Sequence, residues 1–128
     1  MPPRKQMGEL TIIGVGLKAP CHITAEAMAH LRRATVVFGA LNSAGPDRRW
    51  LELTLQKTVL DLNQFYPSDP STDRGECYVA AAEAVLREVR RGRDVAVVTY
   101  GHPTVCDATT DLLLHWSSKE GARRCAAA

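Results

Sequence analysis

The sequence lacks the features of a disulfide-rich, zinc-binding or membrane-spanning protein. Its four cysteines form no Cys-x-x-Cys pair and show no His/Cys ligand spacing, so a structural metal site is not expected. No apolar stretch approaches the ~20 residues that cross a bilayer, and none follows the charged start as it would in a signal peptide. We therefore expect a cytoplasmic protein with reduced thiols and no metal.

The chain also lacks a strong excess of charge. Its formal net charge is +2, and its one basic cluster, residues 87–93, falls at the end of a predicted helix. Cations at that position offset the helix dipole, while a phosphate-binding patch is the alternative. We expect neither a nucleic acid nor a membrane as partner. With 128 residues, 45% of them hydrophobic, the chain is long enough for one globular domain.

Short apolar runs alternate with helical periodicity along the whole chain. This alternation predicts an α/β fold with a mostly parallel sheet and helices on both faces. The strands are expected over residues 10–15, 35–38, 58–62 and 94–99. The helices are expected from a Thr24 cap to Ala34, over 46–55, over 71–91, and from Val105 or Thr109 to His115, with a loop over 63–72.

The helix over residues 71–91 is the strongest of these predictions. Asp73 or one of the two residues before it can cap the helix, and Gly92 suits the position just after its end. The apolar residues expected to face the core are Val79, Ala82, Leu86 and Val89.

The fourth strand ends abruptly in Tyr100-Gly101-His102-Pro103, and this bend is the first candidate site. Ligands of open α/β sheets bind beyond the carboxyl ends of the strands, so we expect chemistry between Tyr100 and Cys106. A lone histidine before a proline is also common as a backbone-bonded loop residue, and that interpretation of His102 stays open.

Arg74 and Tyr78 form the second candidate site, because the long helix should run antiparallel to the fourth strand. Their spacing of four places them on one helical face near that bend, with Tyr66 in the preceding loop. A guanidinium beside phenols can orient or deprotonate a weakly acidic N–H or O–H group. The alternative is that the arginine is solvated and the tyrosines only pack.

Residues 14–19 fit the Gly-x-Gly-x-x-Ala pattern of dinucleotide-binding loops. Two features oppose that interpretation: Pro20 follows at once, and the second strand ends without an acidic residue to hold a ribose. A plain turn and a loop lining another kind of ligand both stay open.

Several segments together resemble the tetrapyrrole methylase family of S-adenosylmethionine-dependent methyltransferases. The resemblance is closest to the borosin-type branch, which N-methylates peptide backbones. It spans about residues 9–121 and is most specific in the segment Tyr100–Pro103 and its upstream helix. The segments that carry it are residues 10–16, 23–24, 34–39, 66, 73–79, 85–92 and 100–103.

The resemblance implies two α/β domains with the methyl donor, S-adenosylmethionine, in the cleft between them. It assigns amide chemistry to Tyr66, Arg74 and Tyr78, with a peptide or small molecule as methyl acceptor. An amide nitrogen is a poor nucleophile, and stabilising its imidate-like form would activate it. The residues implied to line the donor site are Tyr100, Gly101, His102, Pro103, Val105 and Cys106, together with Gly14, Gly16 and Leu17.

This chain departs from the branch in ways that bear on its activity. The branch has glycine where Thr104 stands and an aromatic residue where Cys106 stands. We expect residues 1–8 to be a leader, 9–121 the N-terminal domain of the family and 122–128 an irregular tail, with the second domain absent. A truncated product that is inactive alone is therefore one interpretation, and a homodimer or partner that completes the cleft is another. Alternatives to peptide methylation are a corrinoid or other tetrapyrrole methylase, or a non-catalytic nucleotide-binding module.

Overall fold

The computed structural model describes residues 6–14, 23–40, 46–65, 71, 73–99, 108–120 and 124–127. Within these ranges the strands are β1 (Leu10–Gly14), β2 (Val36–Gly39), β3 (Val59–Asp61), β4 (Val95–Thr99) and β5 (Arg124–Ala127). The helices are α1 (Ala25–Arg33), α2 (Pro46–Leu55), α3 (Arg74–Arg90) and α4 (Ala108–Glu120), with a short 3₁₀ helix, η1 (Leu62–Phe65).

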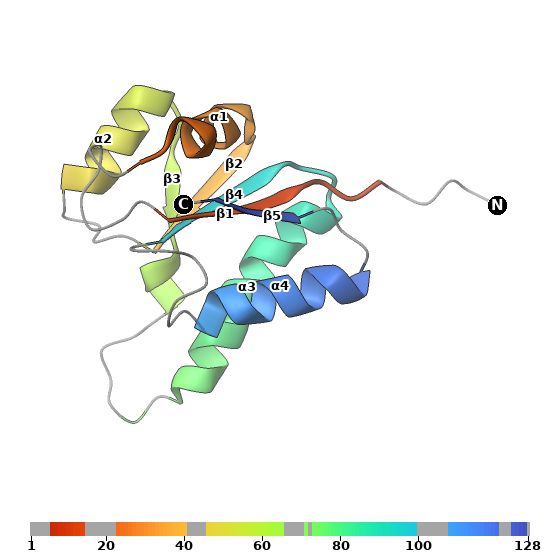
Figure 1. Ribbon diagram of the computed structural model, residues 1–128. Coiled ribbons are helices and arrows are strands. Elements are labelled where there is room, and N and C mark those ends of the chain that lie inside the picture. Colours follow the sequence, from red (N-terminus) through yellow and green to blue (C-terminus); the bar gives the residue numbers. More distant parts are fainter. Residues whose placement is uncertain are drawn as a thin grey trace.

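One five-stranded sheet in the order β3-β2-β4-β1-β5 forms the centre, and its neighbouring strands pair in parallel. Connections from β1 through β3 step one way across the sheet, and the later ones step back. Because such crossovers are right-handed, the two sets of helices cover opposite faces. Accordingly α1 and α2 lie on one face and α3 and α4 on the other (Figure 1). The expected α/β fold with helices on both faces is confirmed.

Parallel strands give the sheet two chemically distinct ends. We call the end where the strands begin, near Gly8, Glu9 and Asp94, the amino pole. The end where they stop is the carboxyl pole, and it is formed by Gly14, Gly39, Asp61 and Thr99. Ligands of such sheets bind at the second of these.

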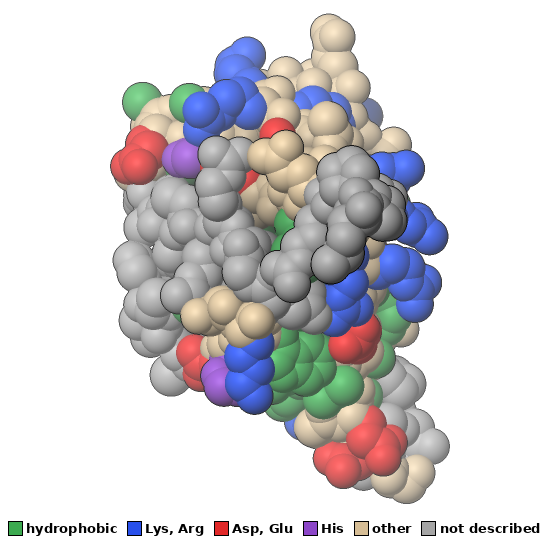
Figure 2. All heavy atoms as spheres, turned by 90° about the vertical axis from the view of Figure 1, so that its right-hand side faces the viewer, with side chains coloured by type: hydrophobic (Ala, Val, Ile, Leu, Met, Phe, Trp, Pro, Cys, Tyr) green, Lys and Arg blue, Asp and Glu red, His purple; other side chains and the backbone are tan. Residues whose placement is uncertain are grey.

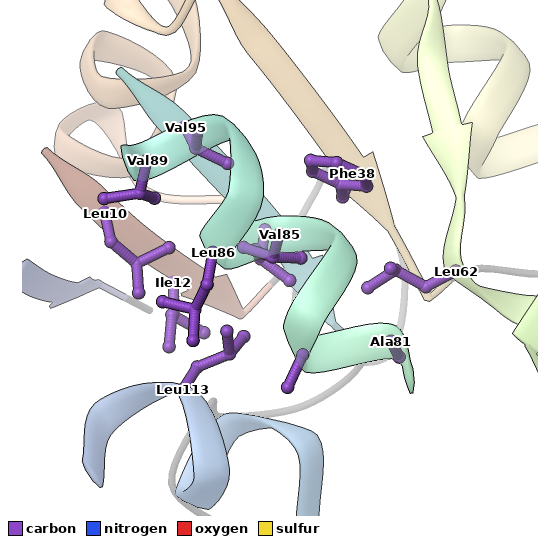
Figure 3. Packing of buried hydrophobic residues seen from close by; sticks show 12 residues of the cluster. Leu10, Ile12, Phe38, Leu62, Ala81, Val85, Leu86, Val89, Val95 and Leu113 are labelled. Atoms are coloured by element: carbon purple, nitrogen blue, oxygen red, sulfur yellow. The ribbon is translucent and has the colours of Figure 1, made fainter. Parts of the chain in front are cut away.

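Two hydrophobic cores sandwich the sheet, and strand alternation assigns residues to each. Ala96 and Val98 of β4 pack in the core beneath α1 and α2. Val95 and Val97 pack in the core beneath α3 and α4, together with Leu86 (Figure 3). A strand that is buried on both faces reads as a continuous apolar run, which explains the sequence of β4.

The helix ends follow the expected local chemistry. Thr24 caps α1 by accepting a hydrogen bond from the Ala27 N–H, and the Asp73 carboxylate caps α3 by accepting one from the Gly75 N–H. At the other end of α3, Gly92 has a φ of 86° and donates its N–H to the Val89 carbonyl. A left-handed conformation of this kind favours glycine, so the predicted end of the helix is confirmed.

The C-terminal segment was expected to be an irregular tail, and this was wrong. Residues 124–127 form β5, which pairs in parallel with residues 10–13 of β1. The sequence hides this strand because alanine is depleted in strands. The strand forms because the edge of β1 offers unpaired backbone N–H and C=O groups, and β5 satisfies them.

Three smaller differences also reflect tertiary contacts. Leu62, expected in the third strand, instead opens η1 and is buried beneath α3, and the rest of η1 lies in the region expected to be loop. Helix α4 continues beyond His115 to Glu120. At the start of the chain, Met7 packs on the α3 core and buried Gly8 donates its N–H to the Val89 carbonyl, so these two residues belong to the domain rather than to a leader.

Candidate functional site

Helix α3 runs antiparallel to the strands, which places its start at the carboxyl pole. Its Val89 is tied to Gly8 at the amino pole, while its Ala81 lies near Leu62, just beyond the end of β3 (Figure 3). From Val89 back to Tyr78 the helix climbs ~16 Å. The strand from Val95 to Thr99 climbs ~13 Å. Tyr78 therefore lies about level with the end of β4.

Arg74 and Tyr78 stand on the first two turns of α3, on one face of the helix. The Arg74 side chain is exposed and the Tyr78 side chain is half-buried. Between them, the Cys77 thiol is buried against the domain. The start of α3 thus offers solvent a guanidinium and part of a phenol, a pair that can hold an oxygen and a proton of the same ligand.

The inward face of α3 lacks one expected residue and includes three that were not expected, Cys77, Ala81 and Val85. Val79 was expected to face the core, but its side chain is 42% exposed. The buried face instead carries Cys77, Ala81, Ala82, Val85, Leu86 and Val89. The sequence pattern omitted Cys77, which continues the spacing of four backward from Ala81 and turns Val79 outward.

Thr99 ends β4 at the centre of the carboxyl pole, and the sequence analysis had not singled it out. Its side chain is only 4% exposed, and none of the described residues provides a hydrogen-bond partner for its Oγ1. An unsatisfied buried hydroxyl destabilises the fold by about 1–3 kcal/mol. The available signal was a polar residue that closes an otherwise apolar run.

Of the site residues expected from the sequence, three lie in the described part of the chain. Arg74 and Tyr78 are at the start of α3, and Gly14 ends β1 beside Thr99 in the strand register. The others lie outside the described residues: Tyr66, Gly16, Leu17, Tyr100, Gly101, His102, Pro103, Val105 and Cys106.

A cavity of about 260 Å³ lies at the opposite, amino pole. It is lined by Glu9, Thr11, His30, Arg33 and Asp94, among others. The Arg33 guanidinium lies 2.9 Å from His30 Nδ1, and the Asp94 carboxylate accepts the Glu9 N–H. His30 Nδ1 also lies 3.9 Å from Glu9 Oε1, which joins α1 to the start of β1, so we interpret this cavity as structural.

In the described part of the chain, no group of three or more His, Cys, Asp or Glu side chains could hold a metal ion. None of the helices there combines the length and the apolar character needed to cross a membrane.

Comparison with known families decides what kind of domain this is. The profile of the Tetrapyrrole (Corrin/Porphyrin) Methylases matches residues 9–122, nearly the whole chain. The chain belongs to the tetrapyrrole methylase family. The resemblance seen in the sequence is thereby confirmed.

The curated relatives within this methylase family also support the borosin-type branch. The chain is 38% identical over 102 residues to a methyltransferase and cyclic peptide (gymnopeptides) precursor of Gymnopus fusipes, covering 80% of this chain and 23% of that protein. It is 34% identical over 116 residues to a methyltransferase and omphalotin A precursor of Omphalotus olearius, covering 91% and 27%. The chain thus spans about a quarter of the length of these relatives.

Solved structures share the fold of this methylase domain at low sequence identity. A conserved hypothetical protein of Aeropyrum pernix K1 superposes with a TM-score of 0.70 at 20% identity, covering 94% of this chain and 38% of that one. The uroporphyrin-III-C-methyltransferase of Thermus thermophilus superposes with a TM-score of 0.62 at 18% identity, covering 92% and 46%.

Proposed function

We propose that this domain takes part in methyl transfer from S-adenosylmethionine to backbone amides of a peptide, at the carboxyl pole of its sheet. The observation that carries the proposal is the direction of α3, which brings Arg74 and Tyr78 level with and beyond the end of β4. Family membership supports methyl transfer, and the names of the curated relatives support a peptide acceptor.

The residues of the carboxyl pole fit a ligand with many polar groups. Gly14 ends β1 and Gly39 ends β2, so side chains do not crowd the edge at these positions. The buried Thr99 hydroxyl between them has hydrogen-bonding capacity that the described fold does not use. When bound, S-adenosylmethionine supplies an electrophilic methyl group on its sulfonium.

The chain's own residues would make the acceptor amide reactive. The nitrogen lone pair of an amide is delocalised into its carbonyl, so the nitrogen gains nucleophilicity as negative charge develops on the oxygen. The Arg74 guanidinium would donate hydrogen bonds to that oxygen and stabilise the charge. The phenol oxygens of Tyr78 and Tyr66 would accept a hydrogen bond from the N–H group and orient it. As the N–C bond forms, the S–CH3 bond of the sulfonium would break to leave a thioether, and the amide proton would pass to water.

The remaining parts of the proposal concern the acceptor, the assembly and the compartment. A peptide is favoured over a corrinoid or other tetrapyrrole because the relatives at 32–38% identity are named as cyclic peptide precursors. We also propose a homodimer or a partner that completes the cleft. A cytoplasmic location, with reduced thiols, is also part of the proposal.

The proposal is tested by mass spectrometry of candidate acceptors. The 128-residue chain is incubated with S-adenosylmethionine and either a peptide or a tetrapyrrole, and added methyl groups are counted. We expect methylation of the peptide alone. Absence of both methyl transfer and donor binding would contradict the proposal, and methylation of the tetrapyrrole alone would replace the acceptor.

The role of Arg74 is tested by substitution. Arg74→Ala should lower the rate of transfer by about 100-fold or more, because one donor to a developing oxyanion contributes that much. Donor affinity measured by calorimetry should be unchanged, and so should the unfolding temperature, since the side chain is exposed. The matched control is Arg87→Ala, an exposed arginine near the other end of α3, which should leave transfer unaffected. Equal losses of transfer and donor binding in Arg74→Ala would exclude the assigned role.

A further inference from the structure

Thr99 occupies an unusual position for a hydroxyl group. It is the last residue of β4, which lies between β2 and β1 in the sheet. Its neighbours in the strand alternate between the two cores, and Val97 belongs to the core beneath α3. The Thr99 side chain therefore faces the same side as α3 and α4, which both begin near this pole (Figure 1).

The Thr99 hydroxyl forms no hydrogen bond with the described residues. The hydroxyl of Thr24 caps a helix, and that of Thr35 donates to the Asp94 carbonyl at 3.2 Å. The hydroxyl of Thr99 is buried without a partner among the described residues. Valine has nearly the same shape and would fill the position without burying a polar atom, so stability alone does not explain threonine here.

The residues beside Thr99 on the two flanking strands are small. Gly14 stands opposite it on β1 and has no side chain. On the β2 side the Ala40 N–H donates to the Val98 carbonyl at 2.9 Å, which places a residue with only a methyl group next to it. This buried hydroxyl, flanked by Gly14 and Ala40, therefore lies at the edge of the sheet where ligands of parallel α/β folds bind.

We propose that the Thr99 hydroxyl is a hydrogen-bonding group of the methyl-donor site. This inference rests on the proposed function and assigns a donor-binding residue inside the central strand. A hydroxyl both donates and accepts, so it pairs with a polar group of the nucleoside or amino-acid part of the donor. S-adenosylmethionine and its product S-adenosylhomocysteine share those groups, so both ligands use the contact.

The test compares three variants of the full chain by calorimetry with S-adenosylmethionine and S-adenosylhomocysteine. Thr99→Val should weaken both ligands by about three- to tenfold, the range for one uncharged hydrogen bond. Without ligand it should unfold about 2–5 °C higher, because the unsatisfied hydroxyl is gone. Thr99→Ser keeps the hydroxyl and should bind within about twofold of the wild type. Thr11→Val is the matched control, a buried threonine of β1 on the other face of the sheet, and should leave both affinities unchanged.

Each other outcome overturns the inference. Unchanged affinity in Thr99→Val means that the hydroxyl does not touch the donor. A lower unfolding temperature in Thr99→Val means that the hydroxyl stabilises the fold. An equal loss of affinity in Thr99→Ser means that the methyl group, and not the hydroxyl, contributes to donor binding. If the wild-type chain binds neither ligand, the proposed function itself fails, whereas wild-type binding that Thr99→Val leaves unchanged removes only this inference.

Discussion

The two poles of the sheet differ in one buried polar group that lacks a hydrogen-bond partner in the described part of the chain. At the amino pole, Lys57 donates to the Leu31, Arg32 and Ala34 carbonyls at the end of α1, and the Glu88 carboxylate binds two arginines. At the carboxyl pole, the Thr99 hydroxyl is buried without a partner among the described residues. The polar groups named at the first pole stabilise the fold, and the one named at the second makes no hydrogen bond within the described fold.

The distribution of charge supports the same division. Basic side chains gather along the upper and right-hand margins of the amino pole, which faces the viewer in Figure 2. Helices α1 and α3 carry basic residues in their last turns, where cations offset the helix dipoles: Arg32, Arg33, Arg87 and Arg90. Phosphate binding is not needed to explain the basic cluster of residues 87–93, because Glu83 and Glu88 form ion pairs with three of its arginines.

The comparison predicts, first, that a glycine-to-alanine substitution destabilises the protein much more at the amino pole than at the start of α3. A Cβ on buried Gly8 would lie 1.7 Å from the Arg93 carbonyl oxygen, so the backbone must shift. We expect Gly8→Ala to lower the free energy of unfolding by about 2–4 kcal/mol. At the start of α3, a Cβ on Gly75 would lie 3.3 Å from the Asp73 Oδ1, which can move.

Gly75→Ala should therefore change stability by no more than about 1 kcal/mol, because helix propensity offsets the contact. Urea unfolding of both variants measures the difference. A large loss at Gly75 together with no loss at Gly8 would contradict the assignment of structural and functional poles.

The second prediction concerns Lys57, whose ammonium caps α1. Lys57→Met keeps the apolar stem but removes the hydrogen bonds to three carbonyls. We expect a loss of about 1–3 kcal/mol in the free energy of unfolding, measured by urea titration, with donor affinity unchanged. Arg49→Met on α2 is a control with little expected effect, since this side chain is exposed. A Lys57→Met protein of unaltered stability would show that the amino pole does not depend on these contacts.

The smallest predicted effect is on the pH dependence of stability. Burial lowers the pKa of Lys57 below its ordinary value of 10.5. In the window between the lowered pKa and pH 10.5 the unfolded chain therefore binds more protons than the folded one, and the contribution of Lys57 to stability rises with pH. The difference in unfolding free energy between wild type and Lys57→Met should grow across this window. A difference that stays flat or shrinks would contradict the pKa direction.

The sequence predicted best what local chemistry decides. Asp73 and Gly92 set the ends of α3, and Pro46 set the start of α2, because caps and turns depend on residue types within a few positions. It could not predict β5 or η1, since both exist through contacts with distant strands and helices. Val79 was misplaced because two apolar stripes fit the same helix and only packing chooses between them.

The candidate site was likewise predictable from the sequence only in part. The shared face of Arg74 and Tyr78 and the antiparallel run of α3 follow from helical spacing and a tight connection, so the sequence could place them near the end of β4. The lack of a hydrogen-bond partner for the Thr99 hydroxyl within the described ranges could not be predicted, because it depends on all the residues that pack around this side chain.

The central claim, that the methyl donor binds at the carboxyl pole, is tested most directly by amide hydrogen exchange of the wild-type chain with and without S-adenosylmethionine. We predict that S-adenosylmethionine slows amide exchange in the last residues of β4 and the first turns of α3, and leaves exchange around Glu9, His30 and Asp94 unchanged. Slower exchange confined to the cavity at the amino pole, or no change anywhere, would contradict it.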